Sequence, residues 1–154
     1  MGEYAQAECY FDTVLSSSNP NDEEIACVFY SFGRIHRLKG DFSRALNCFN
    51  RAYQLNIGAR PKRRASAGKV MNGLGIVYSE RGQVLLAEEC FQRAMKLYKR
   101  TIPKYHVDTA GILINLGAVD CRRGNVRRES CEKYYFLESV DLVRRSIEEI
   151  SKSE

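Results

Sequence analysis

The stretch FGRIHRLKGDFSRALNCFNRA, residues 32–52, recurs in similar form 42 positions later as LGIVYSERGQVLLAEECFQRA, residues 74–94. Two series of glycines keep this spacing along the chain: Gly33, Gly75 and Gly117, and Gly40, Gly82 and Gly124. The offset also aligns identical residues, in the pairs Ala45 and Ala87, Cys48 and Cys90, Phe49 and Phe91, Ala52 and Ala94, and Leu55 and Leu97. A register shared by so many residue types indicates an internal repeat.

Each copy of the repeat predicts a pair of helices. In the first copy, apolar residues recur at helical spacing within residues 23–40, at Ile25, Val28, Phe29, Phe32, Ile35 and Leu38. Gly40 ends this helix, and Asp41 is placed to cap a second one, whose apolar face includes Phe49 and Ala52. Gly33 allows the two helices to approach closely. Because one hairpin cannot bury both of its faces alone, the copies must stack.

The motifs of both copies resemble the signature of the tetratricopeptide repeat (TPR) family. They are Phe29-x2-Phe32-Gly33-x2-His36 with Ala45-x3-Phe49-x2-Ala52, and Met71-x2-Leu74-Gly75-x2-Tyr78 with Ala87-x3-Phe91-x2-Ala94. Tryptophan is absent, and His36 stands where tyrosine is usual. The common TPR period is about 34 residues, whereas 42 resembles the longer repeat of kinesin light chains. The resemblance implies an all-α, right-handed solenoid of stacked helix-turn-helix hairpins.

We expect one domain over residues 1–154, with about three and a half repeats. Residues 2–17 match the second helix of a partial repeat, residues 22–57 and 66–100 form repeats, and residues 107–150 form a degenerate repeat with an extended C-terminal helix. That last helix carries a narrow apolar seam of Phe136, Val140, Val143, Ile147 and Ile150. The seam either caps the stack or joins two copies of the chain in a homodimer.

Composition favours a soluble, cytoplasmic protein. The 154 residues are 44% hydrophobic, and no apolar stretch approaches the roughly 20 residues of a membrane span. The N-terminus lacks the basic and apolar regions of a signal peptide. Six cysteines lie in apolar helical segments without metal-site spacing, so we expect them to be reduced and buried.

The chain shows little sign of catalytic chemistry. His36 and His106 have no cysteine or carboxylate at ligand spacing, so no metal site is expected. No phosphate-binding loop, nucleophile elbow or zinc-protease helix occurs. The sequence therefore predicts neither an enzyme nor a cofactor.

The resemblance instead implies a protein–protein interaction module, an adaptor or scaffold whose first helices line a concave groove. The family's groove positions correspond here to Tyr30, Arg34, Arg37, Lys69, Asn72, Ile76, Ile114, Asn115 and Arg122. Because this lining is basic and carries amides, we expect it to bind an extended, acidic peptide. One alternative is a targeting or regulatory fragment of a larger multidomain protein. A nucleic-acid-binding repeat is another, suggested by the basic pairs Lys99-Arg100, Arg122-Arg123 and Arg127-Arg128.

The most basic run, ARPKRRASAGK at residues 59–69, aligns with the segment between the second and third repeats. In this register Ser66 falls on Asp108, at a position just before a first helix, where both residues are good N-caps. Arg63-Arg64-Ala65-Ser66 also matches the pattern favoured by arginine-directed kinases, which makes Ser66 a candidate phosphorylation site. Lys62-Arg63-Arg64 is an alternative nuclear address.

Overall fold

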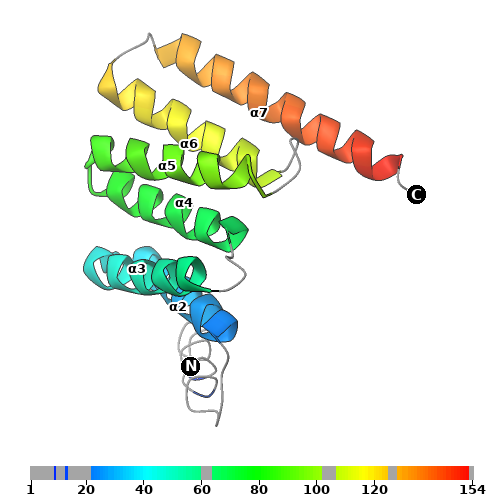
Figure 1. Cartoon of the computed structure of the whole chain (residues 1–154). Helices are drawn as coiled ribbons and strands as arrows, with labels where there is room; N and C mark the ends of the chain where they lie inside the picture. The colour runs from blue at the N-terminus through cyan, green and yellow to red at the C-terminus, as the bar shows by residue number, and fades with distance from the viewer. Residues whose placement is uncertain are drawn as a thin grey trace.

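The structure is a computed structural model that describes residues 9, 13, 22–59, 64–101, 107–124 and 128–152. Within these ranges it is entirely helical, and its helices follow one another as hairpins (Figure 1). They are α2 (Asp22–Leu38), α3 (Phe42–Gly58), α4 (Arg64–Glu80), α5 (Val84–Tyr98), α6 (Val107–Arg123) and α7 (Arg128–Ser151). The expected partial repeat at residues 2–17 lies outside the described residues, apart from Cys9 and Thr13.

The turns within the hairpins use glycine in the left-handed region. Gly40 and Gly82 have φ angles of +77° and +75°, which a residue with a Cβ atom rarely adopts. After α2, the amide of Gly40 bonds the carbonyl of Arg37, and the amide of Asp41 bonds the carbonyl of His36. This is the Schellman arrangement that satisfies the last carbonyls of a helix. It recurs around Gly82, so both turns reverse the chain in the same way.

Asp41 caps α3 as predicted. Its side chain accepts a hydrogen bond from the backbone amide of Arg44, at 3.0 Å. Gln83 holds the matching position before α5 but makes no side-chain cap bond. The first hairpin therefore has a stabilising contact that the second lacks.

Glycine lets aromatic rings fill the space between helices. A Cβ atom on Gly33 would lie 2.7 Å from the ring of Phe49, and one on Gly75 would lie 2.5 Å from the ring of Phe91. Phe49 also meets Gly73 of the following hairpin, where a Cβ atom would lie 2.9 Å from the ring. Phe49 is fully buried between these two backbones. The glycines thus determine how closely the helices pack.

Three hairpins, α2 with α3, α4 with α5 and α6 with α7, stack in sequence order. The second helix of one hairpin packs on the first helix of the next, so that α3 contacts α4 and α5 contacts α6. The core runs continuously through the stack and includes Phe49, Val70, Leu74, Phe91 and Ile112. This architecture confirms the predicted all-α repeat fold.

The expected burial of the cysteines is wrong for those that the structure describes. Cys9 and Cys27 are exposed, and Cys48, Cys90 and Cys121 are half-buried, so none of the described cysteines belongs to the buried core. Cys48 and Cys90 each precede a buried phenylalanine, and this position on a helix is turned about 100° away from the core face. Leu38 is 55% exposed because it lies in the last turn of α2.

The terminal helix α7 packs against α6, and its C-terminal end projects beyond the other helices (Figure 1). Val140 and Ile147 of the expected seam are 47% and 62% exposed, so α6 leaves them uncovered. The side chains of Phe136 and Ile150 lie outside the described part. The homodimer through this helix stays a prediction, and a monomer in light scattering at high concentration would contradict it.

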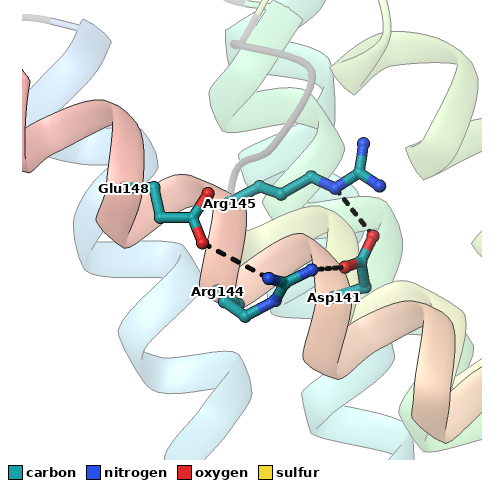
Figure 2. Close-up of polar contacts among 4 residues, drawn as sticks. All are labelled: Asp141, Arg144, Arg145 and Glu148. Carbon is teal, nitrogen blue, oxygen red and sulfur yellow. Dashed lines mark hydrogen bonds and ion pairs between the residues drawn. The ribbon is translucent and has the colours of Figure 1, made fainter.

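Ion pairs connect charged side chains along the surface of α7 (Figure 2). Asp141 accepts from Arg144 at 2.6 Å and pairs with Nε of Arg145 at 2.8 Å, while Glu148 lies 3.4 Å from Arg144. The hydrogen bond from Arg144 lowers the pKa of Asp141. Such pairs, three and four residues apart, support a helix that is largely solvated. No helix in the described part of the chain is long and apolar enough to cross a membrane.

Candidate functional site

The first helices of the hairpins, α2, α4 and α6, form a row in which α4 contacts both α2 and α6. We call the surface of this row the first-helix face. All of the groove residues expected from the sequence belong to these three helices. Polar side chains on the face connect each first helix to the next, as the following contacts show.

An amide pair joins α4 to α6 near the middle of the face. Nδ2 of Asn115 donates a hydrogen bond to Oδ1 of Asn72 at 3.0 Å, and both side chains are half-buried. The bond uses one N–H group and one lone pair. The Nδ2 group of Asn72 and the carbonyl oxygen of Asn115 therefore remain as a donor and an acceptor.

Two arginines make further bridges along the row. Nη1 of Arg37 donates to Oε1 of Glu80 at 2.6 Å, which links α2 to α4. Nη1 of Arg122 donates to the carbonyl oxygen of Ser79 at 2.9 Å and also to the Ser79 hydroxyl, which links α6 to α4. Both arginines therefore use some of their N–H groups in hydrogen bonds to a neighbouring helix, and fewer remain for a partner. The neighbouring Arg123 pairs with Glu88 of α5.

A cluster of ionisable groups lies at the N-terminal end of α6. Nζ of Lys69 is 3.8 Å from Oδ2 of Asp108, whose carboxylate also hydrogen-bonds Tyr98 of α5. Burial raises the pKa of Tyr98, and the Asp108 carboxylate raises it further. Burial also raises the pKa of Tyr30 on α2, against the opposing effect of Arg34. Both phenols therefore stay protonated near neutral pH.

The remaining expected groove residues differ in accessibility. Arg34 is exposed and forms no ion pair with a residue that the structure describes. Ile114 is 49% exposed, whereas Ile76 is half-buried against the core. Arg34 and Lys69 are therefore the cations of the face that are most open to a partner.

Comparisons with known proteins identify the repeat. One tetratricopeptide repeat model matches residues 28–56, and another matches residues 66–128. The chain belongs to the tetratricopeptide repeat family. TPR repeats are generally protein–protein interaction modules.

A solved TPR-like structure shares the fold. The crystal structure of BtubC (BKLC) from P. vanneervenii is similar with a TM-score of 0.71 and 18% sequence identity. The match covers 94% of this chain and 59% of that one, so this chain spans less than two thirds of the BtubC chain. A comparison with curated proteins finds no match.

Sequence reasoning missed the residues that bind the polar side chains of the first-helix face. These are Ser79, Glu80, Tyr98 and Asp108. One signal could have found two of them. Arg37 and Glu80, Asn72 and Asn115, and Ser79 and Arg122 are each 43 positions apart, one more than the repeat. Complementary side chains at this offset indicate contacts between successive first helices.

Ser66 is not the N-cap that the sequence suggested. Helix α4 begins at Arg64, so Ser66 lies within its first turn, where it is half-exposed. Asp108 is likewise inside α6, which begins at Val107. The alignment therefore put the start of each helix too late.

Of the two histidines, only His36 lies among the residues that the structure describes. His36 is half-buried and stacks on Phe32, with ring centroids 6.2 Å apart. His106 falls outside the described residues. Within the described ranges, no group of three or more histidine, cysteine or acidic residues is placed to hold a metal ion.

Proposed function

We propose that the first-helix face binds an extended, acidic peptide, and that the chain acts as an adaptor or scaffold. The observation that supports this most directly is the amide pair of Asn72 and Asn115. Its unused donor and acceptor match the N–H and C=O groups of an extended backbone. Because such contacts do not depend on the peptide's side chains, they favour an extended conformation more than a particular sequence.

The preference for acidic side chains rests on Arg34 and Lys69. Lys69 is 56% exposed, and its 3.8 Å contact with Asp108 is loose enough for a peptide carboxylate to compete. Arg37 is already paired with Glu80 at 2.6 Å, so it adds less. The net charge of +5 favours the approach of an acidic partner at low salt.

Charge reversal tests the assignment. The probe is a fluorescein-labelled ten-residue peptide in which glutamate alternates with serine, followed by fluorescence anisotropy. Arg34→Glu with Lys69→Glu should weaken binding about tenfold, since two exposed contacts become repulsive. The matched control, Lys96→Glu with Lys99→Glu, makes the same change in charge on exposed positions at the C-terminal end of α5 and should bind nearly as wild type.

The amide pair needs its own variant. Asn72→Ala removes one partner of the pair without changing charge, and it should weaken the same peptide severalfold. Equal affinity of all variants would contradict the proposed face. A separate experiment identifies the partners. Affinity purification with mass spectrometry, run in parallel with the wild type and the double charge reversal, shows which proteins are retained only when this face is intact.

A further inference from the structure

Two spaces between successive hairpins can be compared, because equivalent positions in them are 42 residues apart. One lies between α2, α3 and α4 and the other between α4, α5 and α6, and different side chains fill them. Between α4, α5 and α6, the ring of Tyr98 lies against Gly68, where a Cβ atom would be 2.5 Å from the ring. The Tyr98 hydroxyl bonds Asp108, and Lys69 reaches the same carboxylate. Aromatic ring, carboxylate and ammonium together join three helices.

The preceding space has a smaller or neutral residue at each of these positions. Forty-two residues earlier in the chain, Asn56 replaces Tyr98, Ser66 replaces Asp108 and Cys27 replaces Lys69. A cavity of about 260 Å³ remains there between α2, α3 and α4, and all three of these residues line it. The space is therefore open where its counterpart is filled.

A buried amide in this cavity has unused hydrogen-bonding groups. Asn56 is only 3% exposed, and one N–H of its Nδ2 group donates to the carbonyl oxygen of Ala52 at 2.9 Å. Its second N–H and its side-chain oxygen have no partner among the residues that the structure describes. Because leaving such groups unpaired in the interior is costly, the cavity suits a polar occupant, and an acceptor oxygen on that occupant would pair with the second N–H of Asn56.

We propose that Ser66 is a phosphorylation site and that its phosphate occupies this cavity, joining α2, α3 and α4. The Ser66 hydroxyl oxygen attacks the γ-phosphorus of ATP in the active site of a protein kinase. The bond from that phosphorus to the β,γ-bridging oxygen breaks, ADP leaves, and the hydroxyl proton passes to the base of the kinase. The phosphate then stands where the next repeat carries the carboxylate of Asp108.

The position of Ser66 makes it accessible to a kinase. In the sequence, arginines precede Ser66 by three and two positions, the pattern that arginine-directed kinases recognise. Ser66 is half-exposed in the first turn of α4, where the backbone amides have no partner within the helix. Opening this turn to present the serine therefore breaks few hydrogen bonds.

Several groups around the cavity favour a phosphate. Lys69 lies three residues further along the same face of α4, and Tyr30, whose hydroxyl can donate a hydrogen bond, lines the cavity from α2. The N-terminal end of α4 adds the positive pole of the helix dipole. Two carboxylates oppose these groups: Glu23, which also lines the cavity, and Asp108, which shares Lys69. Against these two repulsions, the phosphate gains hydrogen-bond donors from Lys69, Tyr30 and Asn56 and the positive end of the α4 dipole.

The first test uses the whole purified chain with an arginine-directed serine/threonine kinase and ATP, with the modified position mapped by mass spectrometry. Arg127-Arg128-Glu129-Ser130 has the same arginine spacing, so the reaction is run on a Ser130→Ala background. We expect one phosphate, which Ser66→Ala abolishes. Failure to modify Ser66 overturns the proposal.

The second test asks whether the phosphate occupies the cavity. Phosphorylation should raise the melting temperature by about 2 °C, the shift expected from a charge at a helix N-terminus. The rise should shrink in Tyr30→Phe and in Lys69→Gln, each compared with its own unphosphorylated form. A lowered melting temperature, or an equal rise in all forms, overturns the proposal. No peptide is present in either test, so the result does not depend on the proposed peptide binding.

Discussion

The close contact between Gly75 and Phe91 leads to a quantitative prediction. In an ordinary helix interior, glycine to alanine stabilises by about 1 kcal/mol. Here the new Cβ atom would lie 2.5 Å from the Phe91 ring, and Phe91 is only 1% exposed. Restoring an ordinary contact of about 3.5 Å requires α4 and α5 to move apart by about 1 Å.

We therefore expect Gly75→Ala to destabilise the protein. An overpacking cost of about 3 kcal/mol, less about 1 kcal/mol of helix propensity, leaves a loss of about 2 kcal/mol. For a chain of this size, the loss corresponds to a melting temperature lower by about 4–8 °C. Urea unfolding followed by circular dichroism at 222 nm measures the free energy, and a thermal scan measures the shift.

A matched control lies in the next first helix. Gly111 is within α6, and a Cβ atom there would meet nothing within 4 Å. Gly111→Ala should therefore stabilise the protein by about 0.5–1 kcal/mol. If Gly75→Ala were as stable as wild type, or stabilised as Gly111→Ala should, the close-contact reasoning would be refuted. Phe91→Leu should lower the free energy of unfolding less in the Gly75→Ala background than in the wild type, because the smaller side chain relieves the contact with the new Cβ atom.

Three further predictions concern single groups. Gln83→Asp should add the missing cap of α5 and raise the free energy of unfolding by about 1 kcal/mol in urea titrations. Because the pKa of Asp141 is lowered in the folded state, its contribution to stability is complete above its ordinary value of 3.8 and is lost as the pH falls through the lowered value. Arg144→Ala should raise this pKa in an NMR titration, and an unchanged value would contradict the pairing. Burial raises the pKa of Cys90 to about 11, so iodoacetamide should alkylate it more slowly at pH 8 than the exposed Cys27; equal rates by mass spectrometry would count against this.

The sequence predicted the features that repeat. The 42-residue spacing of glycines located the hairpin turns, because Gly40 and Gly82 adopt the positive φ that the turn requires. The sequence also predicted that the helices of a hairpin approach closely at Gly33, and the structure shows that the ring of Phe49 lies there. These features depend on the local backbone and on residues of a single hairpin, so the sequence alone is enough to recognise them.

Contacts between hairpins were harder to predict. The bridge from Arg37 to Glu80 depends on how two first helices lie side by side, and the 42-residue alignment pairs equivalent positions rather than touching ones. The sequence also could not show that Cys27 is exposed, because apolar periodicity identifies a face of a helix but not how much of that face a neighbour covers.

The sequence by itself determined the all-α repeat, its glycine turns and the Asp41 cap, since propensity and short-range packing decide these. Only the tertiary structure decided that groove cations are partly used in bridges between helices. It also revealed the cavity beside Asn56, where a residue smaller than Tyr98 leaves the space between two hairpins open. A cavity depends on the volumes of side chains from three helices at once, and no single stretch of sequence contains that information.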